Sequence, residues 1–463
     1  MSAEPRVVIV GAGPAGANAA LALAAAGVRS IVIDDNPRAG GQIFRVGPND
    51  AIGPVKPDPR GVRLRARLAE RADMIEHRAG HEVIGATPER RLTVAPPDGP
   101  VVSLDADALV IATGAVEVSV PVPGWTLPGV FGLGGLQILL KQSALVPDRP
   151  VVLGGTGPLL YLVAAQMVKT GARLAAVVDA ADWPSPRHLL GLAAMPKLLR
   201  QGIGHLLALK RAGVPIHRRA AIAAIDGADG VAAVRIARLR PDWSAESAPD
   251  ATIACGIVGV GFGVRPNVEL TGLIGCAHLY DPATGGWVVR RDEDLATSIP
   301  GVYAIGDGAA IGGVENALAE GTIVAASILR RLGRPTPAGL VDRATGARRR
   351  KTRRTRFRAA INGWSGLRDG IFTLAAFDTI VCRCEGVTRA AIESAAASGF
   401  DELRAAKLHS RAGMGLCQGR VCGDAAARIV AHAAGVAVEA AGMPRARLPL
   451  RPVAFSNVAA PKS

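Results

Sequence analysis

The sequence predicts an α/β fold with two parallel-sheet units and a small, α-rich C-terminal domain. Two strand–turn–helix patterns, at residues 7–26 and 150–167, each run from an apolar strand through a glycine turn into an apolar helix. Four of the six cysteines lie close together near the C-terminal end, between residues 382 and 422. The chain has 463 residues, which is enough for two or three domains with sizeable cores.

The first unit carries a dinucleotide-binding fingerprint, VVIVGAGPAG, at residues 7–16. Its first glycine permits a tight turn, its second lets the backbone approach a pyrophosphate, and its third lets helix and strand pack closely. The N-terminus of the helix then offers free N–H groups to phosphates. The candidate residues of this turn are Gly11, Gly13, Pro14, Ala15 and Gly16. Asp34 ends the next strand, SIVID, where a carboxylate can accept hydrogen bonds from ribose hydroxyls.

The second unit repeats this pattern with one change. Gly155 and Gly157 match the first two glycines, but Leu160 replaces the third, so helix and strand must stand further apart. Asp179, at the end of the strand LAAVVD, keeps the ribose position. This unit is expected to bind NAD(H), to bind ATP or another adenine nucleotide, or to serve only as a packing domain.

Three further stretches read as strands that end in turns: 107–114, 252–263 and 301–310. Two Rossmann-like units in this order, followed by a late Gly-Asp pair, resemble the two-dinucleotide-binding-domain flavoproteins, in which the second nucleotide domain is inserted into the FAD domain. The resemblance implies a discontinuous FAD domain at 1–120 and 280–333 and an inserted nucleotide domain at 121–279. A basic linker at 334–375, a cysteine domain at 376–435 and a tail at 436–463 complete the expected organisation.

The same resemblance assigns flavin-binding roles to residues outside the fingerprint. The glycine turn GGQIF would run beside the pyrophosphate and ribityl chain, and Asp307 would hold the ribityl-phosphate end of FAD. A helix expected to begin near Val314 would point its N-terminus at the flavin, where its dipole stabilises negative charge on the reduced ring. The residues assigned to FAD in this way are Gly41, Gln42, Gly114, Gly306, Asp307, Asn316 and Ala317.

The cysteines follow the pattern C-x-C, a gap of 32 residues, then C-x4-C: Cys382, Cys384, Cys417 and Cys422. Four thiolates from two loops are the usual ligands of a [2Fe-2S] cluster. A zinc site prefers C-x2-C pairs, which fit a C-x-C pattern poorly, and unliganded thiols or a disulfide are the remaining alternatives. The segment resembles the [2Fe-2S] domain of bacterioferritin-associated ferredoxins. It departs from them because those ferredoxins end in C-x2-C.

Composition restricts the function classes. The net charge is +15, but aromatic residues make up only 3% of the chain, so the stacking platforms of nucleic-acid-binding proteins are scarce. Much of the charge lies in ARRRKTRRTRFR at 347–358, a pattern typical of a solvated helix face or linker, with an acidic partner subunit or a membrane surface as alternatives. No secretory signal, membrane span or disulfide framework is evident, so a cytoplasmic location is expected.

Some catalytic groups are missing from the pattern. Disulfide reductases of this fold need a redox-active cysteine pair beside the flavin, but GGQIF contains no cysteine, and Cys255 and Cys276 read as ordinary buried thiols. No histidine lies in a chemical motif, and no residue stands out as the base that would deprotonate an amine. The catalytic residues are therefore unknown, and the carbon chemistry is expected on another subunit.

Over nearly its full length the chain resembles the α subunit of FAD-dependent, dye-linked amino-acid and opine dehydrogenases. The motifs that carry this resemblance are VVIVGAGPAG, DDNPRAGGQIFR, PGWTLPGV, VGFGVRPNVEL, GWVVRRDEDLATSIPGVYAIGD and GMGLCQGRVC. The resemblance implies an electron-transfer subunit that contains FAD and a [2Fe-2S] cluster. Its partner would be a catalytic flavoprotein β subunit of the glycine/sarcosine-oxidase type, and a small, ferredoxin-like γ subunit would be the third component.

Two other interpretations stay open. In the first, the chain is a stand-alone NAD(P)H oxidoreductase that reduces its own cluster. In the second, the cysteine domain is a binding or sensing module without a catalytic role. The substrate, the order of the redox centres and the terminal electron acceptor cannot be read from this sequence.

Overall fold

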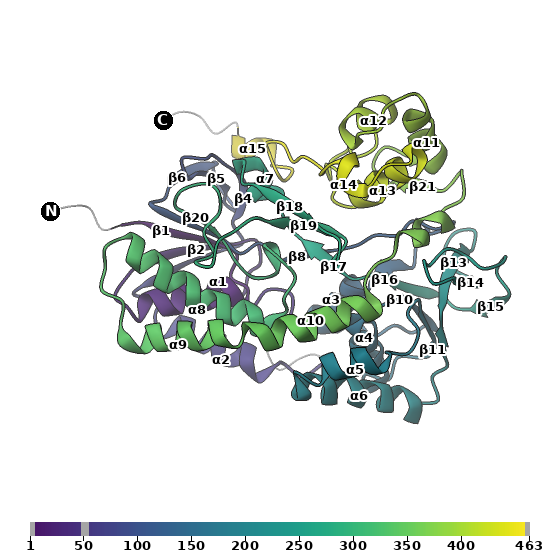
Figure 1. Cartoon of the computed structure of the whole chain (residues 1–463), viewed down its shortest axis with the longest axis horizontal. Helices are drawn as coiled ribbons and strands as arrows, with labels where there is room; N and C mark the ends of the chain where they lie inside the picture. Colours follow the sequence, from purple (N-terminus) through teal and green to yellow (C-terminus); the bar gives the residue numbers. More distant parts are fainter. Residues whose placement is uncertain (1–4, 48–54, 459–463) are drawn as a thin grey trace.

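The computed structural model describes residues 5–47 and 55–458 (Figure 1). Two five-stranded parallel sheets form its centre, one in each predicted nucleotide-binding unit. The first sheet has the order β20 (Val302–Ala304), β7 (Ala108–Ile111), β1 (Val7–Val10), β2 (Ser30–Asp34) and β3 (Ile75–Ala79). The second has the order β12 (Ile216–Arg218), β11 (Leu174–Asp179), β10 (Val151–Gly155), β16 (Ile257–Gly261) and β9 (Val130–Gly132).

The central strands of the first sheet are continuous apolar stretches in the sequence because both of their faces are buried. The four residues of β1 are all buried, as are those of β7. Helix α1 (Pro14–Ala24) covers one face together with α8 (Val314–Arg331), and both helices are rich in alanine where they meet. The helix expected near Val314 therefore begins where the sequence predicts, after Gly313.

Smaller sheets extend the two units and the C-terminal domain. They are β4 (Glu82–Ala86), β5 (Arg91–Ala95) and β6 (Val102–Asp105); β13 (Ala220–Asp226), β14 (Ala233–Arg238) and β15 (Ala251–Ala254); β8 (Ala115–Glu117) with β17 (Val264–Pro266); β18 (His278–Asp281) with β19 (Gly286–Val289); and β21 (Ile380–Cys382) with β22 (Val387–Thr388). The remaining helices of the two units are α2 (Pro59–Ala69), α3 (Leu133–Gln142), α4 (Pro158–Lys169), α5 (Pro186–Leu192), α6 (Pro196–Arg211) and α7 (Glu269–Ile274).

Two expectations about the chain between the units need correction. The stretch 252–263 is two strands, because the chain leaves β15 at Cys255 and Gly256 and enters β16 in a different sheet. The expected domain boundary at residue 280 is also too late. Val268, Leu270 and Ile274 pack into the core of the first unit, together with Val8 and Leu109.

The basic segment is helical. Residues expected as a linker form α9 (Ala338–Arg349), α10 (Lys351–Ser365) and the 3-10 helix η2 (Asp369–Leu374). Figure 1 shows α10 crossing from the α8 side of the first unit towards α4 and α5 of the second. The arginines of this segment are therefore only partly a solvated surface, since α10 packs closely against α5 around Leu192, Ala360 and Ile361.

The C-terminal domain is a compact group of helices. It contains α11 (Arg389–Ala397), α12 (Leu403–Ser410), α13 (Gly423–Ala434) and α14 (Val438–Ala441), and the chain then returns to the first unit and ends in α15 (Phe455–Val458) (Figure 1). The last five residues of the expected tail lie outside the described residues. Within the described ranges, no helix combines the length and apolar character needed to cross a bilayer.

Candidate functional site

The fingerprint turn of the first unit has space for glycine only. Gly11 has φ +105°, and a Cβ placed there would lie 2.3 Å from the carbonyl oxygen of Ala112. A Cβ at Gly16 would lie 1.9 Å from the carbonyl oxygen of Gly11. The sequence interpretation of these two glycines is therefore supported by close backbone contacts in the folded chain.

The second glycine turn lies against the first. A Cβ on Gly41 would approach the Cα of Gly13 to 3.0 Å, and Gly40 N–H donates to the carbonyl of Ala12 at 2.8 Å. Gly11, Gly13 and Pro14 are half-buried, and Gln42 is exposed in the same turn. Together the two turns form a backbone cradle without side chains, which is the shape that a pyrophosphate needs.

Asp34 closes this cradle from the end of β2. Its Oδ2 accepts the N–H of Ala12 at 2.5 Å, and its Oδ1 accepts the N–H of Asn36 at 2.7 Å. The carboxylate thus holds the fingerprint turn in place, a role that the spacing alone does not reveal. Its Oδ1 also accepts from Asn36 Nδ2 at 3.0 Å. A carboxylate has about four acceptor positions, so a hydrogen bond from a ribose remains compatible with these three.

The Gly-Asp pair lies beside the cradle. A Cβ on Gly306 would lie 2.9 Å from the Cβ of Ala15 and 3.7 Å from that of Ala317. The nearby Gly308 packs against the turn at Gly114, whose N would be 2.9 Å from an added Cβ. The predicted flavin residues, although spread over more than 300 positions, therefore surround one place in the fold.

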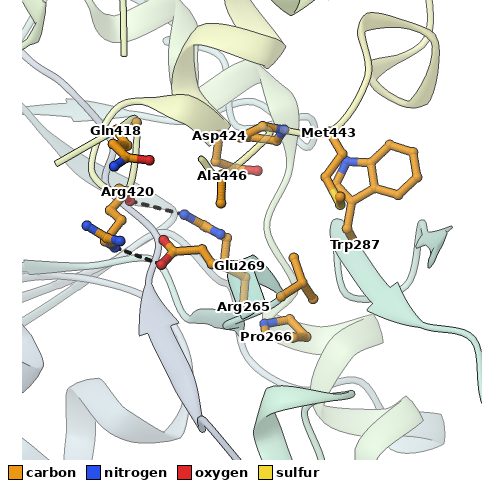
Figure 2. A pocket seen from close by; sticks show the side chains of 12 residues that line it. Arg265, Pro266, Glu269, Trp287, Gln418, Arg420, Asp424, Met443 and Ala446 are labelled. Carbon is orange, nitrogen blue, oxygen red and sulfur yellow. Dashed lines mark hydrogen bonds and ion pairs between the residues drawn. The ribbon is translucent and has the colours of Figure 1, made fainter. Parts of the chain in front are cut away.

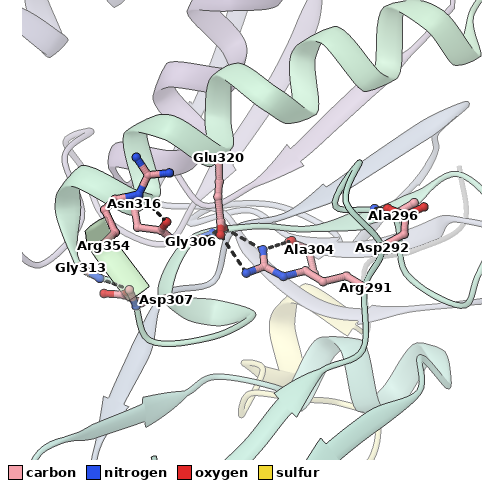
Figure 3. A network of polar contacts seen from close by, with 11 residues as sticks. Arg291, Asp292, Ala296, Ala304, Gly306, Asp307, Gly313, Asn316, Glu320 and Arg354 are labelled. Carbon is pink, nitrogen blue, oxygen red and sulfur yellow. Dashed lines mark hydrogen bonds and ion pairs between the residues drawn. The ribbon is translucent and has the colours of Figure 1, made fainter. Parts of the chain in front are cut away.

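Asp307 organises the start of α8. Its Oδ1 accepts the N–H groups of Gly312 and Gly313, each at 2.8 Å (Figure 3). This bond fixes the turn before α8 and leaves the N-terminus of the helix directed at the cradle side. The expected dipole effect on a flavin is consistent with this placement.

A buried ion pair that the sequence analysis missed supports this turn. Arg291 donates through both terminal nitrogens to Glu320, at 2.8 Å each, and Glu320 Oε2 accepts the N–H of Gly306 at 2.7 Å (Figure 3). Asn316 Nδ2 donates to Glu320 Oε1 at 2.8 Å, and Asn316 Oδ1 accepts from Arg354 Nε at 3.1 Å. The Asn316 side-chain amide is thus engaged in hydrogen bonds within the protein.

The four C-terminal cysteines meet as two pairs, each with one residue from either motif. The Cys384 thiol lies close to that of Cys417, and the Cys422 thiol lies close to that of Cys382. Cys382 and Cys422 are buried, Cys417 is half-buried, and Cys384 is exposed. The glycines between them allow this close approach, since a Cβ on Gly415 would lie 2.2 Å from the Cβ of Cys384.

Backbone amides surround the thiols. Burial opposes ionisation of Cys417, but the N–H groups of Val421 and Gly419 outweigh it and lower the pKa of this thiol. The N–H of Gly413 approaches Cys382 Sγ at 3.4 Å. In the described part of the chain, no group of three or more His, Cys, Asp or Glu residues is arranged to hold a metal ion. Cys255 and Cys276 are buried free thiols, as expected.

The second cysteine motif is docked on the first unit through Arg420. Its Nε lies 2.7 Å from Glu269 Oε2 on α7, and its carbonyl accepts from Arg265 at 3.0 Å (Figure 2). Arg420 also donates to the carbonyls of Cys417 and Leu450. This one side chain therefore connects the cysteine loop, the flavin-type unit and the C-terminal tail.

The second glycine turn differs from the first because it is covered. Gly155, Thr156 and Gly157 are all buried. Asp179 is fully buried, and it accepts the Tyr161 hydroxyl at 2.5 Å and the N–H of Ala181 at 3.0 Å. Burial raises the pKa of Asp179 to about 6.

Comparison with known proteins adds to this geometry. A family model described as pyridine nucleotide-disulphide oxidoreductase matches residues 5–321, and one described as the sarcosine oxidase A3 domain matches residues 378–462. The hydrogen cyanide synthase subunit HcnB of Pseudomonas protegens is 35% identical over 98% of this chain and 97% of its own length. An opine oxidase subunit of Rhizobium meliloti is 36% identical over 98% of both chains.

One solved structure covers both parts of the chain. The crystal structure of L-proline dehydrogenase from P. horikoshii aligns with a TM-score of 0.70 over 98% of this chain and 79% of its own, at 18% identity. At this identity the likeness concerns the fold alone. It confirms the predicted α/β architecture with a helical C-terminal region.

Proposed function

Since this chain belongs to the pyridine nucleotide-disulphide oxidoreductase family and is related over its full length to opine oxidase and hydrogen cyanide synthase subunits, we propose that it is the electron-transfer subunit of a hetero-oligomeric amino-acid or opine dehydrogenase. The family consists of FAD-dependent oxidoreductases. In this proposal, the residues described above would hold FAD at the first unit and an iron–sulfur cluster at the four cysteines.

The first unit supports FAD through its backbone. The cradle at Gly11, Gly13 and Gly41 would hold the pyrophosphate, and Asp34 would accept hydrogen bonds from the ribose. Asp307 would meet the ribityl end, and the N-terminus of α8 would lie near the ring. A bound flavin can take up an electron pair and release single electrons, which is the chemistry that a relay between a substrate and an iron–sulfur centre requires.

The cysteine pairs support a [2Fe-2S] cluster better than a single ion. A structural zinc site prefers C-x2-C pairs, whereas the spacing in this chain is C-x-C and C-x4-C. The thiolates of Cys382, Cys384, Cys417 and Cys422 would hold the cluster, which would supply one-electron transfer. The N–H groups of Val421 and Gly419 would donate hydrogen bonds to the sulfur of Cys417 and favour its thiolate form.

The substrate chemistry is assigned to a partner protein. The relatives named above are themselves called subunits, and we place this chain in a similar assembly. The partner would be a flavoprotein of the glycine/sarcosine-oxidase type, and a small ferredoxin-like protein would be a further component. The side chains around the cradle that we describe have structural hydrogen bonds and show no base poised to take a proton from an amine.

The observation that carries the proposal is the docking of the cysteine loop onto the unit that holds the flavin cradle. Arg420 lies between Cys417 and Cys422 and is bound to α7 of that unit. Two redox groups held in this way would be fixed within one polypeptide, as an electron relay requires.

The test is anaerobic reconstitution of the full chain with FAD, iron and sulfide. We expect one flavin and two irons per chain, and we expect Cys417→Ser to lose the iron while it keeps the flavin. Cys255→Ala, which removes a buried thiol outside the set, should keep both. A chain that takes up one zinc ion and no iron under these conditions would overturn the cluster assignment.

The partner is tested separately. The gene neighbouring this one should encode an amine-oxidising flavoprotein, and co-expression should give a complex in which an amino acid or opine reduces a dye. The purified chain alone should be inactive with the same substrates. Turnover of amines by the chain alone would contradict the division of roles between subunits.

A further inference from the structure

The two glycine turns of this chain are in different environments. The first is half-open at Gly11 and Gly13, so a ligand can reach its N–H groups. The second, at Gly155 to Gly157, is buried, and what buries it is a distant part of the same chain. A dinucleotide needs its pyrophosphate against this turn and the helix that follows it.

The last turn of α10 lies on the second glycine turn. Thr156 Oγ1 donates to the carbonyl oxygen of Ser365 at 3.4 Å, in a buried position. A Cβ on Gly157, the residue that caps α4, would lie 3.5 Å from Ser365 Oγ. Ser365 is itself only 6% exposed, so the place where a pyrophosphate would lie is filled by protein.

This end of α10 is firmly packed. Trp364 Nε1 donates to the carbonyl of Asp182 at 2.7 Å, and its ring packs against the cores of the second unit. A Cβ on Gly191 of α5 would lie 2.6 Å from the Cβ of Ala360, so the two helices are in close contact. The segment that covers the second glycine turn is therefore a packed part of the core and not a loose surface segment.

The ribose position of the second unit is also taken. Asp179 is fully buried and is bound by Tyr161, Ala181 and Arg218, the last at 3.4 Å. Arg218 in turn stacks over the ring of Trp183 at 3.7 Å. The carboxylate therefore stabilises an internal network instead of facing a site for ribose.

The other end of α10 reaches the flavin side. Arg354 contacts Asn316 in the first turn of α8, and Ser365 contacts Thr156 in the second unit. Eleven residues of α-helix span about 16 Å. Helix α10 thus runs from the second glycine turn to the first turn of α8 (Figure 1).

We propose that α10 closes the second unit to nicotinamide and adenine dinucleotides, so that neither NADH nor NADPH reduces a flavin in this chain. A nicotinamide cofactor, which the fold family implies, does not fit the residues present. The second unit then contributes packing and a platform for α10, and electrons reach the flavin by another route. The inference uses the proposed function only for the presence of FAD.

Binding can be measured on the full chain loaded with FAD. Calorimetric titration with NADH, NADPH and ADP should give no saturable binding, and NADH should leave the flavin absorbance unchanged, while dithionite bleaches it. Saturable binding of NADH with bleaching of the flavin would overturn the proposal. Iron content and dye reduction with the partner do not enter this measurement, so failure of the relay proposal is recognised separately.

A variant that opens the turn tests the cause. The double substitution Trp364→Ala, Ser365→Gly removes the covering side chains, and we expect it to gain ADP binding while it keeps FAD. Arg356→Ala, on the exposed side of the same helix, should leave the site closed. A folded, FAD-loaded double variant that still binds no nucleotide would show that α10 is not what closes the unit.

Discussion

Arg358, on α10, has a guanidinium nitrogen, Nε, that is buried without a hydrogen-bond partner among the described residues. Burial lowers the pKa of its guanidinium, against the opposing effects of Asp307 and Asp281. A buried cation near the Gly-Asp turn is balanced best by an anionic ligand there, and the phosphates or the reduced ring of FAD would provide one.

Arg358→Gln should therefore weaken FAD binding. A hydrogen bond to a charged group contributes about 1.5–3 kcal/mol, which corresponds to a rise in Kd of about tenfold to a hundredfold. Flavin fluorescence during dilution measures this. Arg356→Gln removes the same charge from an exposed position on the same helix and serves as the control. Equal FAD affinity in both variants would show that Arg358 does not contact the cofactor.

Asp179 should make stability depend on pH. Its pKa is raised from 3.8 to about 6, chiefly by burial, so between these values the folded chain binds a proton that the unfolded chain has released. Stability from this group therefore falls as pH rises from about 4 to 6, by about 3 kcal/mol for full ionisation.

The measurement is urea unfolding of the wild type and Asp179→Asn across this range. The wild type should lose stability relative to the variant as pH rises through 6. Because other carboxylates are shared by both proteins, their effects cancel in the difference. A difference that stays constant from pH 4 to 7 would mean that Asp179 ionises normally in the fold.

At the scale of elements, the cysteine loop depends on the Arg420–Glu269 pair. Both side chains are mostly buried, at 13% and 19% exposure, so breaking the pair leaves a charge in a poorly solvated place. Arg420→Gln should loosen the loop at residues 413–424 without unfolding the domain. We expect amide exchange there to become about tenfold faster, equivalent to about 1.4 kcal/mol.

The matched control is Arg411→Gln. Arg411 pairs with Glu385 in the same domain, but its side chain is 67% exposed, and exposed pairs contribute little. Exchange in the loop should stay near the wild-type rate in this variant. If Arg411→Gln and Arg420→Gln accelerate exchange equally, the docking contact has no special role.

The elements also show what the sequence could predict. The fingerprint turn, Asp34 and the start of α8 at Val314 are predictable because each depends on a short pattern of glycine, apolar residues and helix-starting residues. Asp307 is assigned only through the resemblance to flavoproteins. The split of 252–263 at Gly256 was missed because an apolar run does not show which sheet each half joins. Spacing alone indicated that the cysteines meet but not how they pair.

Contacts between distant segments were beyond such patterns. Glu320 lies within a helix, and Arg291 lies in a loop of a charged stretch, so nothing local indicates that they pair beneath Gly306. The contact between Ser365 and Thr156 could not be predicted either, because these two residues are more than 200 positions apart in the sequence. The second unit therefore looks like a nucleotide site in sequence while the fold fills it.

For the whole molecule, bound FAD should stabilise the fold by contacting segments that are far apart in the chain. The cradle is made from the beginning of the chain and from residues beyond 300, so a bound ligand stabilises both. At a free FAD concentration about one hundred times its Kd, the stabilisation is about 2.7 kcal/mol. The melting temperature of the apoprotein should rise accordingly when FAD is added.

Gly16→Ala should abolish this rise. Its Cβ would lie 1.9 Å from the carbonyl of Gly11 and would force the fingerprint turn open. Gly346→Ala, on α9, provides the control, because a Cβ at this position would have no atom within 4 Å outside the backbone of its own helix. An FAD-dependent rise that persists in Gly16→Ala would place the flavin elsewhere.

The return of the C-terminal tail to the first unit has a further consequence. Leu450 N–H donates to the carbonyl of Ile84 at 2.7 Å, and Val101 N–H donates to that of Asn457 at 3.0 Å. The cysteine domain is thus attached to the rest of the molecule at both ends. On one side, Gly370 N–H in η2 donates to the carbonyl of Asp242 in the second unit, and on the other side the tail is bonded to the first unit. Such a domain cannot shuttle like a carrier on a flexible arm. In the proposed relay, electron transfer between the cysteine site and the flavin would cross a constant distance, and its rate should not depend on solvent viscosity.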